Sequence, residues 1–311
     1  MRDIEQVKET SLEEIDIREL LAVVWDGKWK IVVITLVFAI GSVINALEES
    51  DRYTASVLLA PAQSGSSGAN IGGALSQLGG LASLAGVTVG DRASDAEIAK
   101  HIMVSWDFVE QFIEDNDLAI PLAAASSWEK PTNSLMLDPG IYDSTTNKWL
   151  SNDGPPTSWV LFQKFSGMLS ISDESGLLRV SIDFYSPEIA KRWLDLYVEQ
   201  INKHMQSRQL EAVTRNIAYL ERQIEQTAIS EMKDVFYTII EEQTKNKMLA
   251  EATPEYAFVS VSPSMVPEMK SGPNRALMCV MGTAAGGIIS IILVLLLHYV
   301  GRQGGPGWLG R

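Results

Sequence analysis

Two long runs of apolar residues, one near each end of the chain, constrain this sequence more than any other feature. The first spans Ile31 to Leu47 and the second spans Ala276 to Val300, and neither contains an Asp, Glu, Lys or Arg. Each approaches the length of about 20 apolar residues that an α-helix needs to cross a bilayer. The residues between the runs are polar enough to fold in water. We therefore predict a chain that crosses a membrane, builds a domain and returns.

The segment between the runs, residues 48–275, carries most of the net charge. The chain has 39 Asp and Glu against 25 Lys and Arg, a formal charge of −14, and most of the acidic excess lies in this segment. A surface this acidic repels nucleic acid and anionic lipid headgroups. We therefore expect no nucleic-acid partner, and we favour a role of the charge in solubility over a specific cation site.

The flanks of the first run predict its orientation. Lys28 and Lys30 stand before it, whereas Glu48, Glu49 and Asp51 follow it. Basic residues concentrate on the cytoplasmic side of membrane spans, and the acidic N-terminal flank is unlike the basic start of a cleaved signal peptide. We therefore predict an uncleaved anchor whose N-terminus is cytoplasmic. Because the second run returns, both termini are cytoplasmic and the central domain is not.

These predictions divide the chain into five parts. The N-terminal part forms an amphipathic segment, in which Ser11 and Glu14 make a capping box. Its apolar face comprises Ile15, Leu20, Leu21, Val24 and Trp25. The parts are the amphipathic segment 1–28, a transmembrane helix 29–47, the central domain 48–275, a second transmembrane helix 276–300 and a tail 301–311.

In the first half of the central domain, the sequence predicts short helices and strands on both sides of a glycine-rich stretch. In residues 64–90, leucine or valine recurs among the glycines, and we favour a mobile loop over a segment that packs against neighbouring subunits or the membrane surface. Residues 121–157 contain five prolines and predict a loop-rich insert. The remaining elements are a strand 53–59, a helix from Ser94 to Asp117 capped by Ser94, a short helix 159–165, and a hairpin of strands 169–172 and 177–184.

The second half predicts two long helices. Ser186, Pro187 and Glu188 provide a cap, a first-turn proline and a first-turn acid. A strand predicted at 256–261 must return to pair with the strand at 53–59, so one continuous helix between them is excluded. Helix propensity falls at residues 227–230, where Ser230 can cap a new helix. We expect an outgoing helix at 187–226 and a returning helix at 231–252.

Three patterns mark candidate interaction surfaces. Val213, Ile217, Leu220 and Ile224 follow a 4-3-4 spacing, close to a coiled-coil seam, and are a candidate oligomer seam. Pro263, Pro267 and Pro273 precede the second apolar run and keep a helix from continuing across the membrane boundary. Small residues within that run form a candidate helix-packing face, which lets another transmembrane helix approach closely. This face comprises Gly282, Gly286, Gly287 and Ser290.

The combined features resemble the chain-length determinant (Wzz-type) family of polysaccharide co-polymerases. The resemblance rests on the apolar runs at both ends, the entry IDIRELLAVVWDGKWKI, the long glycine-free helical region, and YAFVSVSPSMVPEMKSGP before the glycine-bearing second run. The family's usual Asp-Pro-Ala reads Ser262-Pro263-Ser264 here. The glycine-rich stretch and the 121–157 insert carry the least of the resemblance.

The resemblance implies an α+β protein of the Gram-negative inner membrane. Two transmembrane helices would flank a periplasmic domain with a small α/β base and long projecting helices. The chain would form homo-oligomeric rings and act with a Wzy-type polymerase on lipid-linked polysaccharide. It would thereby set the modal length of lipopolysaccharide O-antigen. Alternatives within the same class are enterobacterial common antigen, capsule or exopolysaccharide.

The residue pattern argues against an enzyme. His101, His204 and His298 sit on separate predicted helices, and none has a partner at metal-ligand or catalytic-triad spacing. Cys279 lies within the second apolar run, and no GxxxxGK[ST] motif occurs. We therefore expect no catalytic residues, cofactor or metal. A periplasmic sensor is the alternative from another class, but residues 1–28 are too short for an output domain. A transporter is disfavoured because the spans contain no charged residues.

Overall fold

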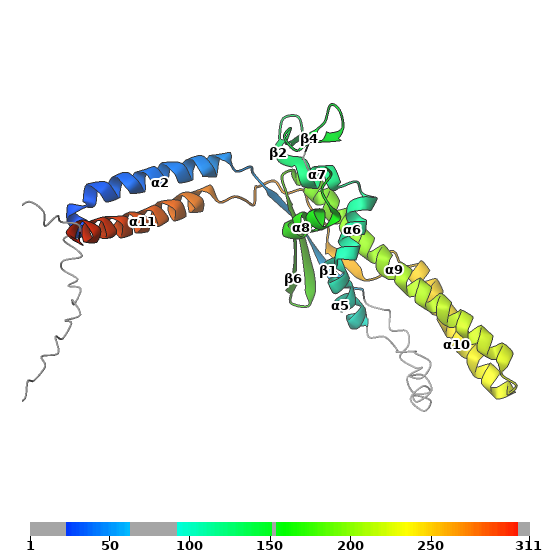
Figure 1. The fold of residues 1–311 in the computed structure, drawn as a ribbon. Helices are drawn as coiled ribbons and strands as arrows, with labels where there is room; N and C mark the ends of the chain where they lie inside the picture. The colour runs from blue at the N-terminus through cyan, green and yellow to red at the C-terminus, as the bar shows by residue number, and fades with distance from the viewer. Residues whose placement is uncertain (1–22, 63–91, 151–153, 304–311) are drawn as a thin grey trace, which may run out of the picture. The chain divides into compact units, whose positions relative to one another are not determined.

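The computed structural model describes residues 23–62, 92–150 and 154–303, which belong to two compact units. The first unit holds helices α2 (Lys28–Glu48) and α11 (Arg275–Gln303). The second unit spans Ser50–Ser271 and holds the sheet and the other helices (Figure 1). The glycine-rich stretch 64–90, the predicted amphipathic segment before Val23 and the tail beyond Gln303 lie outside the described residues.

The two helices of the first unit are long and apolar enough to cross a membrane. They lie side by side and antiparallel (Figure 1). Most of their large apolar side chains are exposed, as they are in helices that meet lipid rather than a protein core. The two apolar runs of the sequence therefore form an antiparallel pair of helices. Helix α11 continues three residues past the predicted end of its span.

The second unit is built on a four-stranded antiparallel sheet with the strand order β6-β7-β1-β8. The strands are β1 (Tyr53–Pro61), β6 (Leu169–Glu174), β7 (Leu177–Phe184) and β8 (Phe258–Ser262). The predicted pairing of the first strand with the last is confirmed, because β1 lies between β7 and β8. The predicted boundaries were inexact: β1 continues to Pro61, and β8 begins at Phe258 rather than Tyr256.

The predicted hairpin of β6 and β7 is confirmed, with Ser175 and Gly176 at its turn. Both residues have positive φ, 51° and 85°. Positive φ at both positions is the signature of a type I′ turn, whose twist matches that of the strands. Alternate side chains of β7 then face the core: Leu178, Val180, Ile182 and Phe184.

The single helix predicted from Ser94 to Asp117 is wrong, because two helices occupy this region. They are α5 (Arg92–Met103) and α6 (Trp106–Asp115). Ser105 causes the break: its hydroxyl donates to the carbonyl of Ile102 at 2.7 Å and accepts from the amide of Phe108 at 3.4 Å. One serine thus closes α5 and caps α6. Ser94 is not a cap, because α5 begins two residues before it.

The insert at 121–157 holds more regular structure than predicted. Helix α7 (Ala119–Ala124) leads into two small antiparallel hairpins. Asn133 and Asn147 adopt positive φ in the turns of these hairpins, a conformation that asparagine tolerates. The hairpin strands are β2 (Ala125–Glu129) with β3 (Ser134–Leu137), and β4 (Tyr142–Asp143) with β5 (Lys148–Trp149). The short helix predicted next is α8 (Ser158–Met168).

The two-helix prediction for the second half is confirmed. Helix α9 (Pro187–Gln226) has 40 residues, and the Ser186 hydroxyl accepts from the Ile189 amide as a cap. At 1.5 Å per residue this helix is about 60 Å long. Helix α10 (Ser230–Glu251) runs back beside it (Figure 1). Ser230 does not cap α10, because it is the first helical residue and Ile229 holds the cap position.

Aromatic rings from three helices form the centre of the core. Tyr197 of α9 lies with its ring centroid 5.4 Å from Phe108, 4.9 Å from Phe112 and 5.4 Å from Phe165. Its hydroxyl donates to the carbonyl of Met103, where α5 ends. Burial raises the pKa of Tyr197, so the phenol stays protonated and keeps this bond. The tyrosine thereby fixes α5, α6 and α8 against the base of α9.

Candidate functional site: helix-packing surfaces and the proline-rich segment

Helices α2 and α11 approach each other at glycines. A Cβ atom at Gly286 would lie 2.4 Å from the Cβ of Phe38, and one at Gly282 would lie 2.4 Å from the Cβ of Ser42. Any larger residue would force the helices apart, so the close approach requires glycine. Gly287 lies off this face, because a Cβ there would meet nothing within 4 Å. The predicted face therefore contains Gly282 and Gly286 but not Gly287.

Ser290 extends the same face by one helical turn. It is fully buried, and its hydroxyl donates to the carbonyl of Gly287 at 2.7 Å. The Ser290 Oγ also lies 3.3 Å from the Thr35 Oγ1 of α2, so a hydrogen bond joins the two helices. Such a bond between membrane helices contributes about 0.6 kcal/mol. The pair is therefore held by close packing at Gly282 and Gly286, by this polar contact, and by a hydrogen bond of 3.2 Å from Arg275 to the Glu49 carbonyl at the end of α2.

Hydrogen bonds hold both ends of the proline-rich segment that follows β8, residues 263–271, against other parts of the second unit. The Ser264 hydroxyl donates to the Asp195 carboxylate of α9. At the other end the Ser271 amide donates to the Arg52 carbonyl at 2.9 Å. Lys270 Nζ also lies 3.0 Å from Asp51 Oδ1. Proline has no backbone amide to donate within a helix or a sheet, and the bonds at Ser264, Lys270 and Ser271 hold this extended segment instead.

Methionines project from this segment on both sides of Pro267. Met265 is 76% exposed and Met269 is 83% exposed. Exposed methionines adapt to varied partner surfaces, because the side chain is unbranched and polarisable. Pro263 and Pro267 belong to the second unit, whereas Pro273 belongs to the first. The proline series thus spans the boundary between the two units along the chain.

The candidate oligomer seam lies on α9 beside α10. Val213 and Leu220 are buried, at 2% and 6% exposure, while Ile217 and Ile224 are half-buried. Val213 and Leu220 are seven residues apart and face the antiparallel partner helix within the same chain. The seam therefore closes the α9–α10 hairpin, and its role between copies of the chain stays a prediction.

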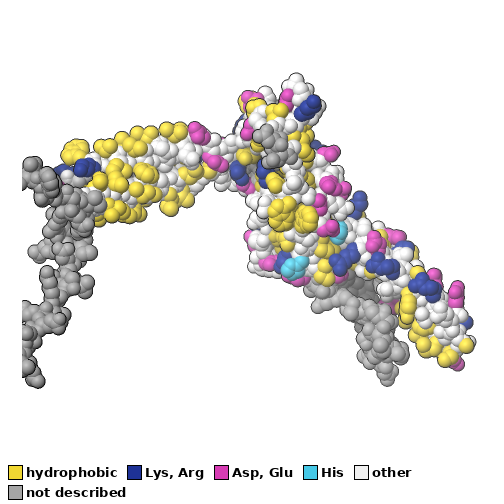
Figure 2. Space-filling model, in the orientation of Figure 1, with side chains coloured by type: hydrophobic (Ala, Val, Ile, Leu, Met, Phe, Trp, Pro, Cys, Tyr) yellow, Lys and Arg dark blue, Asp and Glu magenta, His cyan; other side chains and the backbone are white. Residues whose placement is uncertain are grey.

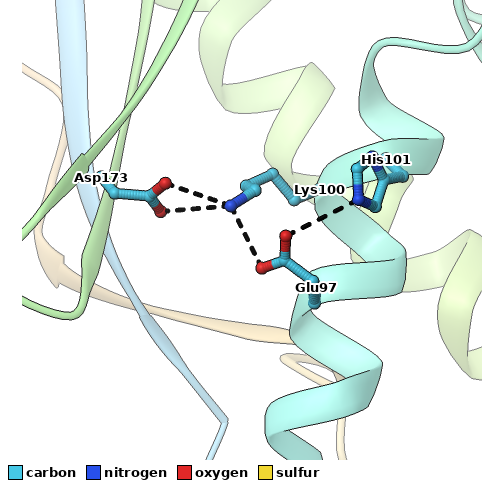
Figure 3. A network of polar contacts seen from close by, with 4 residues as sticks. All are labelled: Glu97, Lys100, His101 and Asp173. Atoms are coloured by element: carbon cyan, nitrogen blue, oxygen red, sulfur yellow. Dashed lines mark hydrogen bonds and ion pairs between the residues drawn. The ribbon is translucent and has the colours of Figure 1, made fainter.

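The titratable side chains form exposed ion pairs rather than a catalytic cluster. Figure 3 shows Lys100 of α5 between Glu97 and Asp173, with Nζ 3.1 Å from an oxygen of each. The hydrogen bond that Lys100 donates to Asp173, followed by the one that it donates to Glu97, raises the pKa of Lys100. His101 Nε2 lies 3.6 Å from Glu97 Oε1. This network ties α5 to β6 at the surface, where solvent weakens it.

The other histidines lie apart from that network. His204 of α9 packs edge-on against Phe108, with ring centroids 5.6 Å apart, and His298 lies on α11. Among the described residues, no group of three His, Cys, Asp or Glu side chains is placed to hold a metal ion. The described part of the chain thus offers surfaces for packing and binding.

Sequence reasoning missed Asn202, a buried polar residue in α9. Its Oδ1 accepts from the amides of Ala257 and Phe258, both at 2.8 Å, and its Nδ2 donates to the Phe258 carbonyl at 2.9 Å. Four residues on, Gln206 Nε2 donates to the Ala250 carbonyl at 2.8 Å, near the end of α10. The Asn202 side chain thus joins α9 to the start of β8, and the Gln206 side chain joins α9 to the end of α10. The signal in the sequence was an asparagine beside the apolar stripe of a helix.

Comparisons with known proteins find a family model that matches part of the chain and two solved structures of low identity. Residues 13–116 match the family model described as chain length determinant protein (Wzz). No curated protein sequence matches the chain. A solved structure described as a full-length bacterial polysaccharide co-polymerase is 15% identical, with a TM-score of 0.41, over 94% of this chain and 100% of its own. A fragment of WzzB, a polysaccharide co-polymerase from Salmonella Typhimurium, is 12% identical, with a TM-score of 0.31, over 72% of this chain and 100% of its own.

The described residues include two helices that are long and apolar enough to cross a membrane. Residues 13–116, about a third of the chain, are similar to the chain length determinant (Wzz) family. The match covers α2, β1, α5 and α6, so it includes the first membrane helix and part of the core of the second unit.

Proposed function

We propose that this chain sets the modal length of lipopolysaccharide O-antigen as a scaffold in the inner membrane of a Gram-negative bacterium. The observation that carries the proposal is the pairing of α2 with α11 through Gly282 and Gly286, in a chain whose residues 13–116 match the chain length determinant family model. A fixed helix pair gives the chain one defined face toward other membrane proteins. The length of the polysaccharide then depends on how long that face keeps a growing chain in elongation.

The proposed topology follows the charge flanks of the helices. Residues 1–28 and 301–311 are cytoplasmic, and residues 48–275 form the periplasmic domain between the spans 29–47 and 276–300. Lys28 and Lys30 lie in the first turn of α2, on the side that the positive-inside rule assigns to the cytoplasm. Labelling of single cysteines from either side of the membrane, in a Cys279→Ala background, tests this arrangement. Modification of a cysteine in the 48–275 segment from the cytoplasmic side would reverse it.

The proposed partners are further copies of the chain, in a homo-oligomeric ring, a Wzy-type polymerase and its lipid-linked polysaccharide. Two exposed apolar surfaces support binding to proteins. One is the outward face of α11, where Val280 is 64% and Ile288 is 62% exposed, and the other includes Met265 and Met269. Exposed apolar surface of this kind marks interaction sites in membranes and in water.

Electrophoresis of lipopolysaccharide tests the proposed function directly. In the wild type, the ladder is expected to show one modal cluster of lengths. Deletion of the gene is expected to remove this cluster and leave a random distribution of lengths, and a plasmid copy is expected to restore the cluster. An unchanged ladder after deletion contradicts the O-antigen assignment. Parallel blots for enterobacterial common antigen, capsule and exopolysaccharide show whether another polymer changes length instead. A shift confined to one of those polymers would move the assignment to it.

A further inference from the structure

Three aromatic side chains form an exposed patch where α6 and α8 begin. Trp106 is 49% exposed, Trp159 is 53% exposed, and Phe162 is half-buried. The rings of Trp106 and Trp159 lie 6.3 Å apart at 87°, and Trp159 lies 5.4 Å from Phe162 at 30°. Figure 2 shows hydrophobic side chains gathered over α8. We call these three residues the aromatic patch.

The aromatic patch stands on a rigid base. Ser105 and Thr157 cap the two helices through hydrogen bonds to backbone amides. Below the patch, Phe112 of α6 and Phe165 of α8 are fully buried, with ring centroids 5.2 Å apart. The exposed rings thus stand on helices that are anchored in the core, and Phe162 itself packs partly against that core. Large exposed apolar groups on rigid elements mark binding surfaces, and tryptophan is enriched there.

A cleft of about 360 Å³ adjoins the aromatic patch along α6 and the start of α8. Its polar lining comes from Glu110, Glu114, Asp117 and Ser158. Glu110 lies one helical turn after Trp106, so the two side chains share a face of α6. Ser158 directly precedes Trp159. Flat apolar rings and hydrogen-bond acceptors therefore lie side by side on one surface.

We propose that the aromatic patch and the adjoining cleft bind an uncharged stretch of the polysaccharide, an inference that rests on the proposed function. A pyranose ring presents C–H groups on its faces and hydroxyls at its edge. The C–H faces pack on the indole rings, and the hydroxyls donate to the carboxylates of Glu110 and Glu114, which only accept hydrogen bonds when ionised.

The negative charge of the cleft distinguishes among the molecules that could bind there. The three carboxylates in the cleft repel a polysaccharide that carries uronic acids. They also repel a second copy of this acidic chain, whose net charge is −14. An uncharged glycan escapes both penalties, so it is the occupant that the surface favours.

Binding measured on the full chain in lipid nanodiscs tests the inference. The two probes are an uncharged O-polysaccharide and a uronic-acid-containing O-polysaccharide, both released by mild acid and followed by saturation-transfer NMR. Wild type is expected to bind the uncharged probe preferentially. Trp159→Ala should weaken that binding by about tenfold, the loss typical of removing one stacking ring, while Trp159→Phe should retain most of it. Tyr219→Ala, which removes an aromatic ring that is 55% exposed on α9, is the matched control and should bind as wild type.

Glu114→Lys provides a second variant at an exposed position. It should leave the fold intact and raise binding of the uronic-acid probe severalfold, because a positive charge replaces a negative one. Equal binding by wild type and Trp159→Ala, or no binding of either probe by wild type, overturns the inference. If the gene deletion alters the ladder while Trp159→Ala binds as wild type, the proposed function stands and only this site is refuted. An unaltered ladder refutes the proposed function itself.

Discussion

The chain contains two antiparallel helix pairs that are held together in opposite ways. In α2–α11 the contact points are glycines, and a methyl group at Gly286 would lie 2.4 Å from Phe38. In α9–α10 the contact points are apolar side chains, of which Val213 and Leu220 are the most buried. Lipid supplies no hydrophobic force between helices, so a membrane pair depends on close packing, whereas a pair in water gains by burying apolar groups.

The spacing of the contact residues follows from the same difference. Gly282, Gly286 and Ser290 recur every four residues, the spacing that brings backbones close in membranes. Val213 and Leu220 are seven residues apart, the heptad spacing of side chains that interlock in water. The spacing of the contact residues thus indicates which face of a helix meets its partner, and whether the pair is suited to lipid or to water.

The largest effect is expected at Asn202, which joins the water-exposed pair to the sheet. Asn202→Leu leaves the Ala257 and Phe258 amides and the Phe258 carbonyl buried without their bonds. The free energy of unfolding should fall by about 3 kcal/mol or more. Denaturant unfolding of the full chain in nanodiscs, followed by near-UV circular dichroism, measures the loss. Lys203→Leu, at the exposed neighbouring position, should stay within about 0.5 kcal/mol of wild type. A similar midpoint for both variants would show that Asn202 contributes nothing specific.

Truncation within the α9–α10 seam should have the next largest effect. Leu220→Ala removes a side chain that is 6% exposed and should cost about 2–3 kcal/mol. Tyr219→Ala removes a larger side chain that is 55% exposed and should cost about 0.5 kcal/mol or less. Hydrogen exchange of α10 amides measures both. If Tyr219→Ala accelerated exchange as much as Leu220→Ala, the seam would not be the contact that holds the pair.

Substitution in the membrane pair tests the other half of the comparison. Gly286→Leu should force α2 and α11 apart at a cost of about 1–3 kcal/mol. Gly287→Leu adds the same side chain where a Cβ meets nothing within 4 Å, and should cost little. The readout is the disulfide yield of a Thr35→Cys, Ser290→Cys pair in a Cys279→Ala background, since the parent oxygens lie 3.3 Å apart. Equal yields in the two leucine variants would rule out glycine packing as the basis of the pair.

Elements with strong local signals could be predicted from the sequence. The apolar runs predicted α2 and α11, Ser186-Pro187-Glu188 predicted the start of α9, and Ser175-Gly176 predicted the turn of the β6–β7 hairpin. In each case the residues that decide the structure are adjacent in the chain. The pairing of β1 with β8 was also predictable, because the chain has to return to its second apolar run.

What could not be predicted depends on contacts between distant residues, except for the break at Ser105, which is local. Ser105 divides α5 from α6 although the apolar period continues through it, because its hydroxyl satisfies the backbone at both helix ends. Gly286 and Gly287 look equivalent in the sequence, and only the position of Phe38 distinguishes them. The aromatic patch was missed for the same reason, since Trp106 and Trp159 are 53 positions apart and meet only in the fold.

The smallest effect is expected at Asp143 in the β4–β5 hairpin, as a response to acid. A hydrogen bond from the Thr146 side chain, and then one from the Thr145 amide, lowers the pKa of Asp143. A lowered folded-state pKa means that the turn gains stability above the unfolded pKa of about 3.9 and loses it as pH falls through the folded pKa. Amide shifts of Thr145 and Thr146 should therefore change at a lower pH than the ordinary aspartate pKa. Asp143→Asn should abolish that titration. The amide shifts of Thr35 and Ser290 should stay constant over the same pH range in both proteins, because glycine packing and the Thr35–Ser290 contact involve no titrating group. A parallel change of those shifts in acid would show that the pair depends on charge after all.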